Sequence, residues 1–271
     1  MAAGKGLGRL AGKTAIVTGA GQTPGQTVGN GRAMALLFAR EGARVLCVDR
    51  VAERAHETAA LVREEGGEAY ALQADVTRAA EVAAIVAEAK ERLGRIDILV
   101  NNVGIGGGDG PVHRVEEAAF DRVLAVNLKG MLLVTKAVVE VMREHQAGAI
   151  VNISSLAALG GAIQLAYEVS KAGVNRLTAH VALSQARHGI RCNAVQPGLM
   201  DTPMAVAGIA GASGRSQEEV RAERDARVPL GGKMGTGWDT AHAALFLASD
   251  DAKFISGAIL PVDGAMGVRI G

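Results

Sequence analysis

Two side chains that can move a proton, those of Tyr167 and Lys171, stand four positions apart, and the pair Ser154 and Ser155 precedes them. On a helix, residues four apart share a face, so the Lys ammonium can lie beside the Tyr phenol. A neighbouring cation favours the phenolate and thereby lowers the pKa of the phenol from its ordinary value of about 10. A nearby Ser hydroxyl can hydrogen-bond the oxygen whose proton moves. These residue types at this spacing therefore predict a proton-transfer centre.

Short runs rich in Val and Ile alternate along the chain with longer segments of helical period. The expected strands cover residues 14–18, 44–48, 69–73, 96–100, 149–153, 191–195 and 258–262. Between them we expect helices, including one over 32–40 and one over 77–93 with Thr77 as its N-cap and Gly94 at its end. This alternation predicts an α/β fold of Rossmann type, a doubly wound, mainly parallel seven-stranded sheet with helices on both faces.

The composition narrows the class of protein. The 271 residues show no linker and no change in composition, so we expect a single domain over 1–271, with an N-terminal extension at 1–11. Lys plus Arg (29) nearly balances Asp plus Glu (28), which argues against nucleic acid and favours a small-molecule partner. An irregular region over 199–230 is expected to form a loop and short helices over the site.

The sequence also indicates where the protein is located and whether it binds a metal. The N-terminus has no apolar stretch typical of a signal peptide, and the apolar segment 131–142 is too short to span a bilayer. Cys47 and Cys192 lie far apart and form no disulfide framework, so we expect a cytoplasmic protein without membrane contact. The six His are dispersed, without a Cys/His cluster, so we expect no metal site.

Polar residues and glycines follow the predicted strands where the chain leaves them. They are Gly19 to Gly21, Asp49, Asp75, Asn101 and Asn102, Ser154 and Ser155, and Pro197 and Gly198. Open parallel sheets bind ligands outside the carboxyl ends of their strands. We therefore expect these residues to converge on one crevice.

The glycine-rich segment from Gly19 to Gly31 lies between a strand and a helix, where glycines let the backbone approach a pyrophosphate. Asp49 stands twenty residues after Gly29, where an acid would accept from a ribose hydroxyl. An acid there repels a 2′-phosphate, which favours NAD over NADP, although Arg50 directly follows and would soften that preference. Asp75 could either cap the following helix or accept from the adenine amino group.

At this point the chain resembles the short-chain dehydrogenase/reductase family in its compact single-domain branch, over about 13–264. The residues that carry the resemblance are Thr18, Gly19, Gly29, Gly31, Asn101 to Gly104, Asn127, Ser155, Tyr167, Lys171, Pro197, Gly198, Thr202 and Val262 to Gly264. The resemblance implies that Tyr167 is the catalytic acid/base and that Ser155 orients the substrate oxygen. It also implies that Lys171 holds the nicotinamide ribose and lowers the Tyr pKa, and that Asn127 supports a proton-relay water.

The residues expected to bind the cofactor are taken partly from the glycine-rich segment and strand ends and partly from what this resemblance implies. They are Gly19, Gly21, Gly29, Asn30, Gly31, Asp49, Asp75, Val76, Asn102, Gly104, Tyr167, Lys171, Pro197, Gly198 and Thr202. The expected function is that of an NAD-dependent dehydrogenase that interconverts a secondary alcohol and a ketone by hydride transfer. A homotetramer is also implied, with helices over 116–142 and 164–187 at an interface.

Three features depart from the family pattern. Gly19 and Gly29 stand ten positions apart, whereas the family has four, so residues 22–28 resemble an insertion in the phosphate loop. Tyr167 stands twelve positions after Ser155 rather than thirteen, so we choose Ser155 as the catalytic Ser and keep Ser154 as the lesser candidate. Val103 replaces the usual Ala.

Other functions stay open at this stage. The chain could be an NADP-dependent ketoreductase, or a protein that binds NAD to sense redox state or assemble a complex without catalysis. An epimerase or dehydratase of the larger related branch fits less well, because the chain after Pro197 is short. The apolar residues Met200, Met204, Val206 and Ile209 suggest an adaptable lid over the substrate, but they could equally belong to the core or to an interface.

Overall fold

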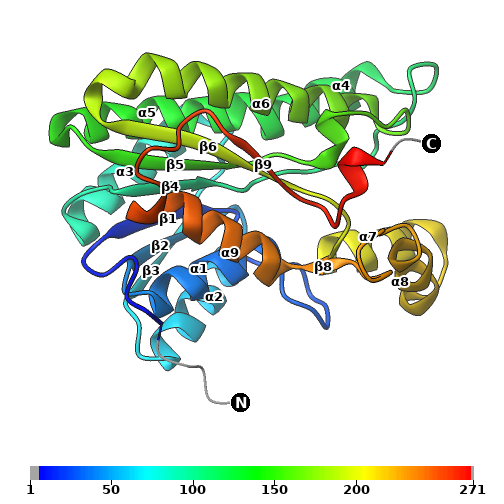
Figure 1. Cartoon of the computed structure of the whole chain (residues 1–271), viewed down its shortest axis with the longest axis horizontal. Coiled ribbons are helices and arrows are strands. Elements are labelled where there is room, and N and C mark those ends of the chain that lie inside the picture. Colours follow the sequence, from blue (N-terminus) through cyan, green and yellow to red (C-terminus); the bar gives the residue numbers. More distant parts are fainter. Residues whose placement is uncertain (1–5, 270–271) are drawn as a thin grey trace.

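The computed structural model describes residues 6–269, and its centre is a parallel sheet of seven strands (Figure 1). The strand order is β3–β2–β1–β4–β5–β6–β9, so the chain starts in the middle of the sheet and winds outward in both directions. The bounds are β1 Thr14–Thr18, β2 Arg44–Asp49, β3 Ala69–Gln73, β4 Ile98–Asn101, β5 Gly148–Ile153, β6 Ile190–Pro197 and β9 Ile259–Val262. The predicted doubly wound sheet is confirmed, and each expected strand overlaps an observed one.

Helices cover both faces of this sheet. Their bounds are α1 Asn30–Arg40, α2 Ala52–Glu64, α3 Ala79–Leu93, α4 Glu117–Leu124, α5 Gly130–His145, α6 Leu165–Gln185, α7 Pro203–Ser213, α8 Gln217–Asp225 and α9 Gly237–Ala248. The helices α1, α2 and α9 pack on one face, and α3, α5 and α6 pack on the other (Figure 1). The two apolar cores therefore lie on opposite sides of the strands.

The central strand β1 shows why apolar runs form strands in this protein. All five of its residues are buried, because helices cover both faces of a parallel sheet. Ala15 and Val17 belong to the core formed with α1, α2 and α9, whereas Ile16 belongs to the opposite core. Alternate side chains of a strand point to opposite faces, and here both faces are apolar.

The predicted cap of the helix after β3 is wrong. This helix, α3, has Arg78 as its N-cap residue and begins at Ala79. The reason is a local turn, in which Asp75 Oδ1 accepts from both the backbone N–H and the hydroxyl of Thr77, at 2.9 and 2.7 Å. The helix ends where expected, at Gly94, whose φ of 78° suits glycine.

The region over 199–230 forms a small helical unit beyond one end of the sheet (Figure 1). The short strand β7 (Met200–Asp201) pairs with β8 (Gly235–Thr236), and α7 and α8 lie between them in the chain. Figure 1 shows α7 and α8 beyond one end of the sheet, away from the layered core. The loop and short helices that were expected there are present.

Part of the expected N-terminal extension lies outside the described residues, namely 1–5. Of the remaining residues, Leu10 is fully buried and Arg9 Nη2 forms an ion pair of 3.0 Å with Glu41 at the end of α1, whereas Leu7 is exposed. Within residues 6–269, no helix has the length and apolar character needed to cross a membrane.

Candidate active site

Tyr167 and Lys171 both project from the first two turns of α6, which places them on one face as their spacing predicts. Tyr167 is half-buried and Lys171 is buried. The Lys171 ammonium lies 5.6 Å from the centroid of the Tyr167 ring. It also donates to the carbonyl oxygen of Ile153, at the end of β5, over 2.8 Å.

The electrostatics of this pair differ from the sequence-based expectation. Burial raises the pKa of the Tyr167 phenol above its ordinary value, and a hydrogen bond with Ser155 opposes this only in part. Burial also lowers the pKa of Lys171 to about 8. The expected net lowering of the Tyr167 pKa is therefore wrong for this geometry, because Lys171 donates to a backbone carbonyl and its charge does not offset the burial of the phenol.

The structure brings Ser155 rather than Ser154 to the phenol. Ser155 follows β5 and caps a short 3₁₀ turn, where its hydroxyl accepts from the N–H of Ala157 over 3.2 Å. The same side chain lies near the Tyr167 phenol, where it acts to lower the pKa of that phenol. Ser154 is buried, and its hydroxyl donates to the backbone carbonyl of Lys171 over 3.3 Å. Ser155 is thus the serine that can share a substrate oxygen with the phenol.

Substitution of each serine by Ala tests this assignment. We expect Ser155→Ala to lower kcat by about a hundredfold, because one preorganised hydrogen bond to the reacting oxygen is lost. The Tyr167 pKa should rise further, which moves the acidic limb of the pH profile for alcohol oxidation, where activity rises as the phenol deprotonates, to higher pH. Ser154→Ala is the matched control and should leave that limb in place. Equal pH shifts in the two variants would contradict the assignment.

Asn127 lies in a π-helical turn over Ala125–Lys129 that joins α4 to α5. Its amide exchanges two hydrogen bonds with the backbone of Ile105, at 2.8 and 2.9 Å, and donates to the Ser170 hydroxyl over 3.1 Å. Such π turns are frequent at functional sites, since they turn a side chain inward. Asn127 therefore links the loop after β4 to the helix that carries Tyr167.

The loop after β4 also approaches the glycine-rich segment and Lys171. Asn102 Nδ2 donates to the carbonyl oxygen of Gly19 over 2.9 Å. A Cβ atom on Gly104 would lie 3.2 Å from Lys171 Nζ, so a glycine leaves room for the buried ammonium. Both residues therefore lie between the glycine-rich segment and the proton-transfer residues.

A cavity of about 250 Å³ opens at the carboxyl ends of β1, β2, β3 and β4. The predicted cofactor residues that line it are Gly19, Gly21, Gly29, Asn30, Gly31, Asp49, Asp75, Val76, Asn102, Gly104 and Thr202. Pro197 and Gly198 do not line it; they belong to the end of β6 and the turn that follows. Tyr167 and Lys171 do not line it either, although Gly104, which does, lies next to the Lys171 ammonium. The predicted convergence of strand ends on one crevice is therefore present for β1 to β4, whereas Ser154 and Ser155 after β5, like Pro197 and Gly198 after β6, do not line the cavity.

The cavity wall fits a dinucleotide. A Cβ atom on Gly31 would collide with the carbonyl oxygen of Gly19, and one on Gly21 would lie 2.6 Å from Asp49 Oδ2. These glycines thus let the turn after β1 pack closely against the N-terminus of α1 and the end of β2, and the unpaired N–H groups at that helix N-terminus attract phosphate. Asn30, at the start of α1, has a buried Oδ1 atom without a hydrogen-bond partner among the described residues.

The electrostatics around the predicted ribose site are mixed. Asp49 Oδ2 accepts from the N–H of Gly21 over 3.1 Å and its Oδ1 accepts from the N–H of Val51 over 2.9 Å, so the carboxylate is held toward the cavity. Arg50 and Arg54 also line the cavity. Sequence reasoning missed Arg54, although its position in the first turn of α2, directly after the Asp49 strand end, was a usable signal.

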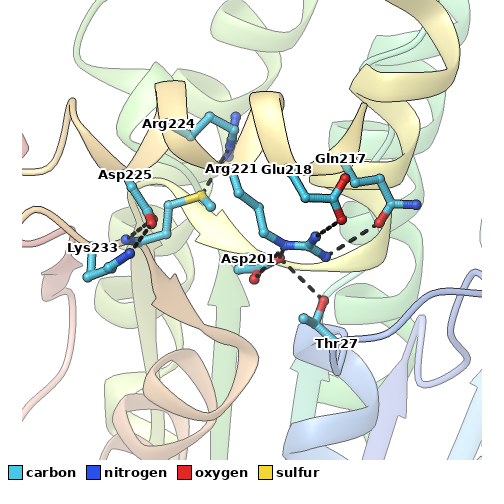
Figure 2. Close-up of polar contacts among 9 residues, drawn as sticks. Thr27, Asp201, Gln217, Glu218, Arg221, Arg224, Asp225 and Lys233 are labelled. Carbon is cyan, nitrogen blue, oxygen red and sulfur yellow. Dashed lines mark hydrogen bonds and ion pairs between the residues drawn. The ribbon is translucent and has the colours of Figure 1, made fainter. Parts of the chain in front are cut away.

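The insertion over 22–28 lies against the region over 199–230 (Figure 2). Thr27 donates to Asp201 Oδ1 over 3.5 Å, and Arg221 of α8 lies 3.2 Å from Asp201 Oδ2. A Cβ atom on Gly25 would lie 2.7 Å from Pro203, at the start of α7. Gln22 lines the cavity with Thr23, and its Oε1 accepts from the N–H of Gly29 over 2.8 Å. The insertion therefore joins the cofactor cavity to the expected lid.

A second carboxylate organises the loop before Tyr167. Glu168 Oε1 accepts from three consecutive backbone N–H groups, those of Ala162, Ile163 and Gln164, at 2.9, 3.0 and 3.1 Å. Ala162 has a φ of 92°, which is unfavourable for a residue with a Cβ atom. Burial would raise the pKa of Glu168, but these three hydrogen bonds outweigh it and the pKa is lowered.

This arrangement predicts a pH-dependent stability. A carboxyl group whose pKa is lowered by folding stabilises the protein above its unfolded pKa of about 4.3, and this contribution is lost as the pH falls through the folded value. We expect Glu168→Gln to reduce the free energy of unfolding by about 1 kcal/mol or less at neutral pH, since the group is partly exposed. Urea unfolding should show that this difference shrinks in acid. Glu64→Gln, an exposed control, should show no such pH-dependent difference.

The comparisons with known proteins agree with this geometry. A family model described as enoyl-(acyl carrier protein) reductase matches residues 25–267. Cis-4-hydroxycyclohexanecarboxylate dehydrogenase of Sinomonas cyclohexanicum is 42% identical over 253 residues, which cover 93% of this chain and 95% of that protein. A crystal structure assigned to the short-chain dehydrogenases/reductases, from Burkholderia xenovorans, is 43% identical with a TM-score of 0.89 and covers 97% of this chain and 99% of that one.

A solved structure of NAD⁺-bound xylitol dehydrogenase is 33% identical, with a TM-score of 0.84, and covers 94% of this chain and 99% of that one. The chain belongs to the short-chain dehydrogenase/reductase family. It is accordingly an NAD(P)-dependent oxidoreductase, whose relatives act on small alcohols.

Proposed function

We propose that the protein is an NAD-dependent dehydrogenase that interconverts a secondary alcohol and the matching ketone. The observation that carries the proposal is that Tyr167 lies beside Ser155 and Lys171, and that Lys171 adjoins Gly104 in the wall of a glycine-lined cavity that contains Asp49. A phenol that can exchange a proton beside a dinucleotide site suits alcohol oxidation, in which the hydroxyl oxygen loses a proton and the carbon that bears it loses a hydride.

In this proposal Tyr167 takes the hydroxyl proton of the alcohol during oxidation and returns it during ketone reduction. Ser155 donates to the same substrate oxygen and holds it near the phenol. Lys171 stays largely protonated at neutral pH, since its pKa is about 8, and in the complex its charge would act against the rise in the Tyr167 pKa that burial causes in this structure. Asn127 holds the loop after β4 against α6.

Bound NAD supplies the hydride acceptor. Gly19, Gly21 and Gly31 would admit its pyrophosphate, and Asp49 would accept from a ribose hydroxyl. The Thr202 hydroxyl, which makes no hydrogen bond within residues 6–269, would meet the carboxamide at the nicotinamide end. Val103, with its extra bulk, still lines the cavity beside Gly104.

The substrate would approach from the side covered by α7. Met204 and Ile209 on this helix are exposed, and Met204 lines the cavity. The Leu159 and Ile163 side chains, from the loop before Tyr167, are also exposed. These apolar groups suit a hydrocarbon substrate, as does the hydroxycyclohexane ring in the name of the relative from Sinomonas cyclohexanicum.

The test is a spectrophotometric assay of NADH formation with secondary alcohols, polyols and hydroxysteroids, and of NADH consumption with ketones. We expect turnover with NAD that exceeds turnover with NADP. Tight binding of NADH without turnover on this panel would instead favour the redox-sensing alternative.

NADP-dependent ketone reduction remains the second candidate, because Arg50 and Arg54 line the same cavity as Asp49 and could pair with a 2′-phosphate. A higher kcat/KM with NADPH would select it. We further propose that the chain acts as one dinucleotide-binding and catalytic domain, in the cytoplasm, as a homotetramer. Size-exclusion chromatography with light scattering measures that assembly.

A further inference from the structure

The first turn of α6 carries Tyr167, and this turn has an unusual source of hydrogen-bond acceptors. The first N–H groups of any helix lack partners within the helix, and a side chain at the N-cap position normally accepts from them. The N-cap residue of α6 is Gln164, whose side chain accepts from none of them. Its Nε2 instead donates to the carbonyl oxygen of Gly106 over 3.0 Å.

The missing acceptor comes from a residue far away in the chain. Asp109 Oδ2 accepts from the N–H of Tyr167 over 2.8 Å, and its Oδ1 accepts from the N–H of Ala166 over 3.2 Å. The neighbouring Gly110 carbonyl accepts from the N–H of Leu165 over 3.0 Å. A carboxylate at this position also interacts favourably with the positive end of the helix dipole.

The carbonyl group of Tyr167 is held as well. It accepts from the Ser170 hydroxyl over 2.7 Å, and Ser170 in turn accepts from Asn127 over 3.1 Å. Asn127 is bonded to Ile105, in the same loop that carries Asp109. Both polar groups of the Tyr167 backbone are therefore tied, directly or through two side chains, to the loop over 105–110.

We infer that Asp109 is a positioning residue for Tyr167, whose backbone it holds against the loop after β4 by capping the first turn of α6. The inference rests on the proposed function, in which Tyr167 exchanges the substrate proton. Because this loop continues from Asn102 and Gly104, which line the cavity, one short segment would fix the phenol relative to the bound cofactor.

The test compares Asp109→Asn and Asp109→Ala with Asp121→Asn, an exposed carboxylate on α4. Asn keeps one acceptor oxygen and loses the charge, whereas Ala loses both acceptors. We expect kcat to fall by about tenfold in the Asn variant and about a hundredfold in the Ala variant, because small misplacements of a catalytic group are costly. The dissociation constant for NADH should stay unchanged in all three variants, and Asp121→Asn should keep the wild-type kcat.

Backbone amide hydrogen exchange gives a readout that does not need turnover. The N–H groups of Ala166 and Tyr167 should exchange at least about tenfold faster in Asp109→Asn than in the wild type, and no faster in Asp121→Asn. Unchanged exchange would overturn the inference, as would faster exchange with an unchanged kcat. If the wild-type protein turns over no alcohol or ketone, the proposed function fails, and the exchange rates still decide whether Asp109 holds Tyr167 in place.

Discussion

Tyr167→Phe should lower kcat by at least about a hundredfold while leaving the affinity for NADH close to that of the wild type. The change removes only the phenolic oxygen, so the ring can still pack beside Lys171 and Gly106. A Cβ atom added to Gly106 would lie 3.6 Å from Tyr167 Cδ2. Without that oxygen no group at this position can take the hydroxyl proton of the substrate. Steady-state kinetics and NADH fluorescence titration measure the two quantities.

The chain offers a matched control for this prediction, since it contains only two tyrosines. Tyr70 lies on β3, and its hydroxyl donates to Glu68 over 3.0 Å, far from the cavity lining. Tyr70→Phe removes the same atom and should leave kcat unchanged. Retained turnover in Tyr167→Phe would exclude the phenol as acid/base and with it the mechanism proposed above.

Asp49→Asn should shift the ratio of kcat/KM for NAD to that for NADP toward NADP by about ten- to a hundredfold, because a negative charge no longer opposes the 2′-phosphate. The amide keeps one oxygen, so the N–H of Val51 can retain its acceptor and the turn after β2 should persist. Initial rates with both cofactors give the ratio.

Two further variants sharpen this second prediction. Arg54→Ala removes a cation from the same cavity and should move the ratio in the opposite direction, toward NAD. Glu53→Gln changes a neighbouring exposed carboxylate on α2 outside the cavity lining and should leave the ratio unchanged. If Asp49→Asn and Glu53→Gln behave alike, Asp49 does not contact the ribose.

Taken together, the carboxylates of this protein have three distinct expected effects. Asp49 should affect the choice of cofactor, Asp109 should affect kcat, and Glu168 should affect stability in a pH-dependent way. Each has its own readout, so the corresponding variants separate cofactor recognition, positioning of the phenol and order of the loop before it.

The sequence by itself determined the elements of this fold and the residues of the proton-transfer pair. Most strands were predictable because the apolar runs of β1, β2, β4, β5 and β6 are buried on both faces, and a window of about five residues, near the usual length of a strand, is enough to detect such a run. The positions of Tyr167 and Lys171 were predictable because one helix carries both. The glycines and Asp49 were predictable from their places at strand ends.

Only the tertiary structure decided which distant groups meet. Asp109 caps α6 from 58 residues away, and no local pattern marks it, because its partners are backbone N–H groups that any sequence would present. The contact of the insertion with Asp201 and the hydrogen bond of Lys171 to Ile153 were likewise not predictable, because each joins residues that are distant in the sequence. The pKa of Tyr167 also depends on burial, which arises only when the loops after β4 and β5 close around α6. Local periodicity encodes elements, whereas burial and long-range hydrogen bonds depend on how those elements pack.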